Sequence, residues 1–142
     1  MQLSEIMTAE VQVVDQGTSI RDAARKMKQT DVGAMPVVED GTVVGMLSDR
    51  DLAVRAVADG MEPDETTVGE LMTPVVIHLY EDQTVQEAAE AMKERRVRRL
   101  IVFNRDDEPT GMLSIGDLAV RGLDKPAAGE LLEAVSEPAH PK

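Results

Sequence analysis

One segment occurs twice in this chain and limits the folds that it can adopt. Gly-Met-Leu-Ser-Asp-Arg-Asp-Leu-Ala-Val-Arg occupies residues 45–55, and Gly-Met-Leu-Ser-Ile-Gly-Asp-Leu-Ala-Val-Arg occupies residues 111–121. Only the two residues between the serine and the aspartate differ. Each copy predicts a strand that ends in a serine, followed by a helix with an aspartate in its first turn. The duplication indicates a tandem repeat, so we expect two related halves.

The serine and aspartate of each copy, Ser48 with Asp51 and Ser114 with Asp117, have two interpretations. A helix N-terminus carries unpaired N–H groups and partial positive charge that suit a phosphate, and the two side chains could hold sugar hydroxyls. The same spacing is that of a helix capping box. It also occurs where we expect a cap alone, at Ser19–Asp22, Thr67–Glu70 and Thr84–Glu87. Capping and ligand binding are compatible, so the ligand hypothesis depends on the surroundings of both copies.

Composition excludes several classes of function. The 142 residues include one tyrosine, one phenylalanine and no tryptophan, so an aromatic platform for single-stranded nucleic acid is not expected. A formal net charge of −12 would repel a phosphate backbone. The chain has no cysteine, and its two histidines, His78 and His140, are far apart, so neither a disulfide nor a zinc site is predicted. With no apolar signal or membrane-spanning run, we expect a soluble, cytoplasmic protein.

The repeat is about 65 residues long and begins before the duplicated segment, since Met7-Thr8 matches Met72-Thr73. Its pattern predicts the order β-α-β-β-α in an α+β fold. The predicted strands are residues 11–14, 35–38, 42–47, 75–77, 100–103 and 110–113. Predicted helices begin at residues 19, 48, 84 and 114. We expect one repeat in residues 1–60, a second in 61–125, and a helical segment with a frayed tail in 126–142. A three-stranded sheet with two helices exposes an apolar face, so the sheets should pack on each other.

Two such repeats, each with Met-Thr near its start and Gly-x-Leu-Ser-x-x-Asp before its last helix, resemble a pair of CBS domains (a Bateman module). The Asp-Arg-Asp segment and the acidic linker are also similar to the mycobacterial hypoxic response protein 1 group. The resemblance implies pseudo-twofold symmetry, two clefts between the repeats, adenosine-containing ligands, and a homodimer formed through the helices. It places Ser48, Asp51, Ser114 and Asp117 against ribose and phosphate. It also implies an apolar slot for the base, formed by Thr8, Val11, Met35 and Pro36 in one repeat and by Thr73, Val76, Leu100 and Ile101 in the other.

The two repeats differ in the residues around the expected ligand. Ile101 replaces Pro36, and Arg98-Arg99 replaces Gly33-Ala34. Arg98 or Arg99 could bind a phosphate with two hydrogen bonds, which favours the second repeat for a phosphorylated ligand. The first repeat offers Arg50, beside the acidic Asp49. The arginines also have a plain explanation, because cations are favoured at the C-terminal end of a helix whatever the function.

Two functions follow from these observations. The first is a regulatory module that binds an adenosine-containing ligand of the AMP, ADP, ATP, S-adenosylmethionine or NAD type and signals to a protein partner that the sequence does not name. The alternative is a structural or interaction protein with unoccupied clefts. No enzyme is expected, because two distant histidines and no cysteine give no nucleophile–base pair. No obligatory cofactor, nucleic acid or membrane partner is predicted.

Overall fold

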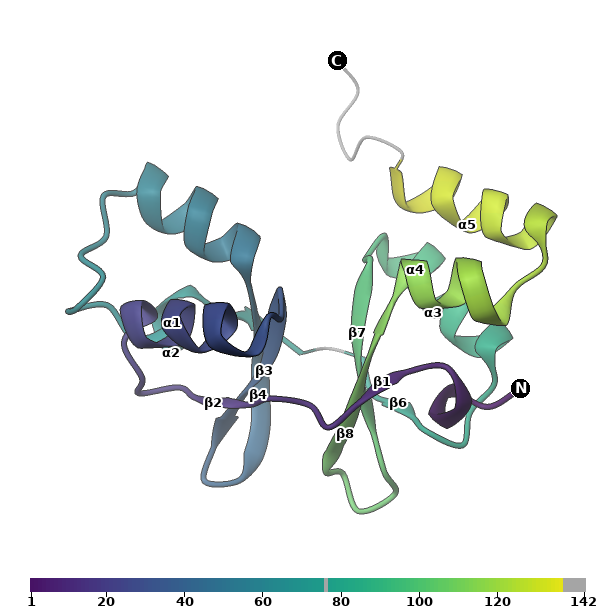
Figure 1. Ribbon diagram of the computed structural model, residues 1–142, viewed down its shortest axis with the longest axis horizontal. Helices are drawn as coiled ribbons and strands as arrows, with labels where there is room; N and C mark the ends of the chain where they lie inside the picture. The colour runs from purple at the N-terminus through teal and green to yellow at the C-terminus, as the bar shows by residue number, and fades with distance from the viewer. Residues whose placement is uncertain (76, 137–142) are drawn as a thin grey trace. The chain divides into compact units, whose positions relative to one another are not determined.

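The computed structural model describes residues 1–75 and 77–136 (Figure 1). Its contacts divide the chain into two compact units. The inserted unit is Val11–Val76, and the outer unit combines Met1–Glu10 with Ile77–Lys142. The sequence of the inserted unit interrupts that of the outer unit, which gives the two units their names. Each unit has a four-stranded sheet with helices packed on it, which confirms the predicted α+β class with two repeats.

The sheet of the inserted unit has the strand order β2-β3-β4-β5. β3 (Ala34–Glu39) and β4 (Thr42–Ser48) form an antiparallel hairpin. The hairpin turns at Asp40 and Gly41, whose φ angles of 50° and 81° are those of the predicted tight turn. The outer strands are short: β2 (Val14–Asp15) runs parallel to β3, and β5 (Thr73–Pro74) runs antiparallel to β4.

Three helical segments complete the inserted unit: α1 (Ile20–Thr30), the π-helical η2 (Asp51–Ala56) and α2 (Val68–Leu71). α1 begins after Ser19, whose hydroxyl accepts a hydrogen bond from the Asp22 N–H at 3.1 Å, as its capping sequence predicts. The core lies between these helices and one face of the sheet. It is aliphatic, as the composition requires, and includes Ile20, Ala23, Met27, Met35, Val37, Leu47, Val68 and Leu71.

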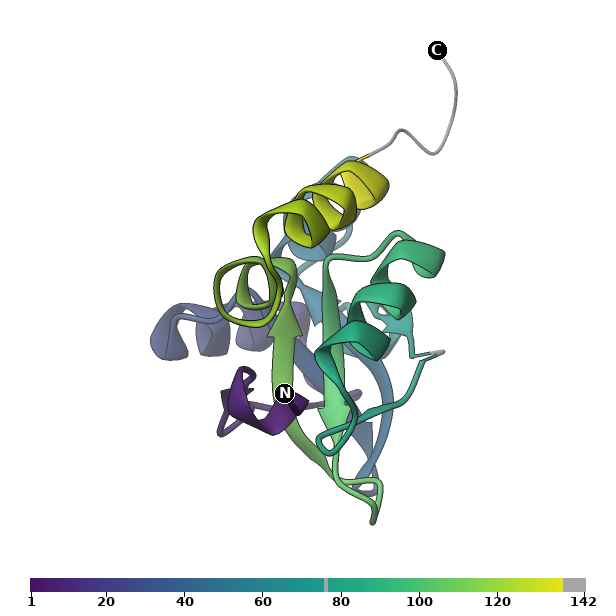
Figure 2. The same ribbon diagram turned by 90° about the vertical axis from the view of Figure 1, so that its right-hand side faces the viewer.

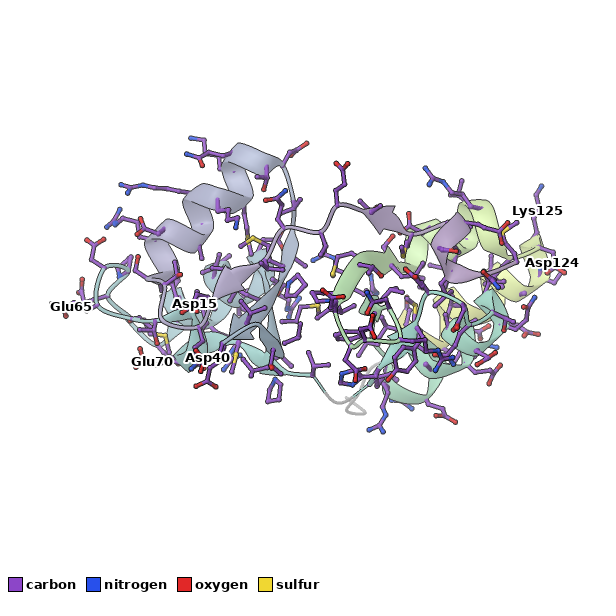
Figure 3. All side chains as sticks on the ribbon, turned by 90° about the horizontal axis from the view of Figure 1, so that it is seen from below. Asp15, Asp40, Glu65, Glu70, Asp124 and Lys125 are labelled. Carbon is purple, nitrogen blue, oxygen red and sulfur yellow. The ribbon has the colours of Figure 1, made fainter. Side chains whose placement is uncertain are left out.

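The outer unit repeats this plan with the strand order β1-β8-β7-β6. Its strands are β1 (Thr8–Ala9), β6 (Leu79–Tyr80), β7 (Arg99–Phe103) and β8 (Pro109–Ser114). Its helices are η1 (Leu3–Glu5), α3 (Val85–Arg95), α4 (Ile115–Asp117), η3 (Leu118–Gly122) and α5 (Lys125–Ser136). Asp124, labelled in Figure 3, begins α5 by accepting a hydrogen bond from the Ala127 N–H at 2.9 Å. α5 adds Leu131 and Val135 to the core of this unit.

Each Met-Thr segment joins the sheet of the other repeat. Thr8 in β1 pairs with Met112 in β8, and Thr73 in β5 pairs with Met46 in β4. The glycine of each duplicated segment permits this crossing. A Cβ on Gly111 would lie 2.9 Å from the Thr8 carbonyl oxygen, and one on Gly45 would lie 2.9 Å from that of Thr73. Only glycine allows two backbones to approach so closely.

Two predicted strands differ from the structure in their bounds or do not form in the described residues. Residues 11–13 lie outside any strand, and β2 begins at Val14. Residues 75 and 77 also lie outside strands, and residue 76 is outside the described part of the chain. Both segments are rich in β-branched residues, but a strand also needs a hydrogen-bonding partner, and pairing occurs on either side of them instead. The division at residues 60 and 125 follows the sequence repeat and stays a prediction, whereas the compact units divide the chain after Glu10 and after Val76.

Candidate functional site

In the inserted unit, the serine–aspartate pair closes the start of the helix after β4. Asp51 Oδ2 accepts hydrogen bonds from the Ser48 N–H at 2.9 Å and from the Ser48 hydroxyl at 3.0 Å. Ser48 Oγ in turn accepts from the Asp51 N–H at 3.2 Å. The Asp51 side chain is only 14% exposed, and its Oδ1 lies 3.7 Å from Arg55 Nη1. The same Nη1 donates to the Leu71 carbonyl oxygen at 2.7 Å, which holds the guanidinium beside this carboxylate.

The pair of the outer unit has the same cap and a different electrostatic environment. Asp117 Oδ2 accepts from the Ser114 N–H at 2.9 Å, and Ser114 Oγ accepts from the Asp117 N–H at 3.1 Å. Arg121 occupies the position that corresponds to Arg55, but within the described residues Asp117 makes no ion pair. Its second oxygen therefore keeps its capacity to accept a hydrogen bond. The capping interpretation is confirmed in both units, and the two aspartates differ in how far their charge is neutralised.

The sheets place further predicted residues in rows beside these pairs. Residues directly opposite each other on paired strands share a face of the sheet. In the outer unit, Arg99 lies opposite Ser114, and Ile101, Met112 and Thr8 form the next row on the same face. In the inserted unit the equivalent positions are Ala34 opposite Ser48, followed by Pro36, Met46 and Thr73. The serine of each motif therefore stands next to a row that ends in the threonine of a Met-Thr segment.

These rows show which predicted slot residues are neighbours within one sheet, and the slots themselves stay a prediction. The prediction places Thr8 with Met35 and Pro36, whereas the sheet neighbours of Thr8 belong to the second repeat. Thr73 likewise joins Pro36 and not Ile101. The sequence repeat shows that the two Met-Thr segments are equivalent. It does not show which strand each of them pairs with.

Two of the residues predicted for the slots lie in the cores of their units. Met35 is fully buried and Leu100 is 6% exposed, and both belong to the cores beneath the helices. They alternate with Pro36 and Ile101, which point to the other face of their strands. Val11 is half-buried and lies in the segment before β2, and Val76 lies outside the described residues.

The three arginines predicted near a ligand, Arg50, Arg98 and Arg99, lie in different parts of the structure. Arg98 precedes β7, is exposed, and donates from Nη2 to the Ser136 hydroxyl of α5 at 3.3 Å. Its carbonyl oxygen accepts from the Ile115 N–H at 2.9 Å, which ties it to the start of the motif helix. Arg99 shares the face of Ser114, and Arg50 is exposed just before η2. Of the two arginines in the second repeat, the register therefore favours Arg99 as the neighbour of a ligand at Ser114.

A second polar cluster in the outer unit was not predicted from the sequence. Arg105 donates to the two carboxylate oxygens of Asp82 at 3.0 and 2.8 Å and lies 4.2 Å above the ring of Tyr80. This hydrogen bonding lowers the pKa of Asp82 and raises that of Arg105. Tyr80 donates to Asp107 at 2.9 Å, which raises the pKa of the phenol. Tyr80 at the end of β6 and Asp82 in the turn after it are far in the sequence from Arg105 and Asp107 in the loop between β7 and β8, so no local sequence pattern identifies the cluster.

The family model described as the CBS domain matches residues 3–57 and 68–123. This chain belongs to the CBS-domain family. The match covers both repeats, and a CBS pair is a regulatory fold. None of the helices in the described part of the chain is long and apolar enough to cross a membrane. Among the same residues, no group of three histidine, cysteine or acidic side chains could hold a metal ion.

Similar proteins extend over almost the whole chain. The CBS domain-containing protein YhcV of Bacillus subtilis is 35% identical over 134 residues, which cover 94% of each protein. Hypoxic response protein 1 of Mycobacterium tuberculosis is 31% identical over 135 residues, which cover 94% of this chain and 93% of the relative. This likeness confirms the predicted resemblance to that group.

Two solved structures share the fold. Hypoxic response protein 1 with two coordinated zinc ions has a TM-score of 0.74 at 30% identity, with 85% of this chain and 98% of that chain covered. The CBS-pair protein CBSX2 in complex with AMP, a protein from Arabidopsis thaliana, has a TM-score of 0.67 at 28% identity, with 83% and 93% covered.

Proposed function

We propose that this CBS pair is a regulatory module that binds an adenosine-containing ligand at its serine–aspartate motifs and passes the binding event to a protein partner. The observation that carries the proposal is the pair of reciprocal caps, each of which holds a carboxylate and a hydroxyl at the start of a helix. Such a helix start suits a phosphate, and the carboxylate suits ribose hydroxyls. The AMP complex of CBSX2 supports this ligand class.

Of the two motifs, that of the outer unit is the better candidate. Asp117 has an oxygen without a described partner, whereas the corresponding oxygen of Asp51 already faces Arg55 at 3.7 Å. Arg99 lies opposite Ser114, where the inserted unit has only Ala34. A guanidinium at this position would add charge-assisted hydrogen bonds to a phosphate. We therefore expect a phosphorylated ligand to bind at Ser114 and Asp117.

Thermal unfolding of the purified protein with AMP, ADP, ATP, S-adenosylmethionine, NAD and NADH tests the proposal. A ligand at a hundred times its dissociation constant should stabilise the fold by about 2.7 kcal/mol. For a chain of this size, the melting temperature should then rise on the order of 5–10 °C. Asp117→Asn should abolish the rise, and the matched variant Asp51→Asn should retain it. Asparagine can still accept the capping hydrogen bond, so the fold should survive both changes.

The alternative, a structural or interaction protein that binds no ligand at these motifs, predicts a different result. No nucleotide at millimolar concentration would then change the melting temperature, and both asparagine variants would behave alike. We also propose that the chain forms a homodimer, as its family resemblance implies. Analytical ultracentrifugation tests this separately, and a monomer at micromolar concentration would contradict it.

A further inference from the structure

Arg55 links the aspartate of the inserted-unit motif to the helix that precedes β5. Its Nη1 lies 3.7 Å from Asp51 Oδ1, one helical turn away, and donates to the Leu71 carbonyl oxygen at 2.7 Å. Leu71 is the last residue of α2, where carbonyl groups have no partner within the helix, so it offers an available acceptor. Leu71 is also fully buried and lies two residues before β5, which is paired with β4. The guanidinium is therefore held by a fixed acceptor outside its own helix.

The outer unit has the same local sequence without this link. Asp-Leu-Ala-Val-Arg occurs in both motifs, so Arg121 has the same spacing from its aspartate as Arg55. Among the described residues, however, the Arg121 side chain makes neither an ion pair nor a hydrogen bond. Its helix η3 ends at Gly122, and Leu123 has an extended backbone, after which the chain turns into α5 (Figure 2). In the inserted unit, helical structure continues through residue 58, so Arg55 lies within the helix and beside α2.

The link leaves the two motif aspartates with different capacities to bind a ribose. Both oxygens of a carboxylate accept hydrogen bonds. The cap uses Oδ2 in both motifs, so Oδ1 is the oxygen available to the hydroxyls of a ribose. In the inserted unit, Oδ1 of Asp51 faces the Arg55 guanidinium, whereas in the described part of the outer unit no cation pairs with Asp117. A ribose at Asp51 must therefore displace a guanidinium that Leu71 holds in place.

We propose that Arg55 is a specificity-determining residue, which weakens ribose binding at the inserted-unit motif and so directs an adenosine-containing ligand to the outer unit. This inference rests on the proposed function and adds the residue that disfavours one of its two motifs. Discrimination between two similar sites often depends on a group that opposes binding at one of them. The Arg55 side chain is 47% exposed, so its ion pair is modest. The corresponding loss of affinity is about threefold to tenfold.

An NMR titration measures the two motifs separately, because the Ser48 and Ser114 amides each donate to the aspartate of their own motif. AMP is the probe, and ATP is titrated in parallel. In the unmodified chain, we expect the Ser114 amide to saturate at a nucleotide concentration at least tenfold lower than the Ser48 amide. Arg55→Ala should tighten binding at Ser48 by about threefold to tenfold and leave the affinity at Ser114 unchanged. The matched control Arg121→Ala should change neither affinity.

Two further variants show whether the gain depends on Asp51. In the Arg55→Ala chain, Asp51→Asn should remove most of the gain, because the oxygen that the arginine releases then no longer belongs to a carboxylate. Arg55→Gln keeps a neutral donor for the Leu71 carbonyl oxygen and removes the charge. It should tighten binding at Ser48 in the same direction, and it replaces Arg55→Ala if that variant unfolds.

The proposal is overturned if removal of the arginine changes the affinity at Ser48 by less than twofold, or if it weakens binding there. It is also overturned if the Ser48 and Ser114 amides of the unmodified chain saturate together. Saturation at Ser114 without a gain at Ser48 refutes the role of Arg55 alone and leaves the proposed function intact. If neither amide shifts in any variant at millimolar nucleotide, the proposed function fails and this inference fails with it.

Discussion

Gly111 lies where β1 crosses β8, and the structure leaves no room there for a side chain. A Cβ at this position would lie 2.5 Å from Met7 Sδ and 2.9 Å from the Thr8 carbonyl oxygen. The methionine side chain can rotate away, but the carbonyl belongs to the backbone of a strand whose Ala9 pairs with Gly111 itself. Gly111→Ala therefore requires β1 to move away from β8. Overpacking of this kind costs about 1–3 kcal/mol, which lowers the melting temperature of a chain this size by roughly 3–10 °C.

Thermal unfolding followed by circular dichroism measures this loss, with Gly129→Ala as the matched control. A Cβ on Gly129 would meet no atom within 4 Å, and the residue lies inside α5. Alanine should therefore raise the stability there by about 0.5–1 kcal/mol through its better helix propensity. If Gly111→Ala unfolds within 1 °C of the unmodified chain, the close crossing of β1 and β8 is wrong. If both substitutions destabilise equally, the loss reflects glycine replacement in general.

Two further predictions concern the outer unit. Leu131→Ala empties a fully buried position of α5 and should cost about 2–4 kcal/mol. Leu132→Ala, at a residue 45% exposed, should change the stability by less than about 0.5 kcal/mol, and equal urea midpoints for the two variants would contradict the packing of α5. The hydrogen bonds from Arg105 lower the pKa of Asp82, so the stability that they provide is present above the unfolded pKa and is lost as the pH falls through the lowered folded pKa. Arg105→Ala should return the pKa of Asp82 to its ordinary value in an NMR titration, and an unchanged pKa would refute this pairing.

The parts of the fold that depend on local pattern could be predicted from the sequence. The central hairpins follow from short apolar runs, and Asp40-Gly41 specifies the tight turn between β3 and β4. The caps at Ser19, Thr84 and Ser114 follow from a hydroxyl followed three residues later by an acid. In each case the information lies within a few consecutive residues.

The parts that depend on distant contacts could not be predicted. Both copies of the duplicated segment offer the same glycine, so the sequence does not show which of them Thr8 crosses. For the same reason, the sequence does not show which Met-Thr segment lies in the row beside Ser48 and which lies in the row beside Ser114. The sequence predicts a helical segment after residue 126, but it does not show that α5 packs on α3 and η3.

The interruption of one unit by the other also determines the order in which native contacts become available during synthesis. The inserted unit is continuous, so all of its strands have been translated once β5 has left the ribosome. β1 is made first but pairs with β8, roughly a hundred residues later in the chain, and a contact of such long sequence separation forms late. Until then the first ten residues lack their native partner strand. Residues 1–10, although translated before the inserted unit, are therefore among the last to reach their native positions.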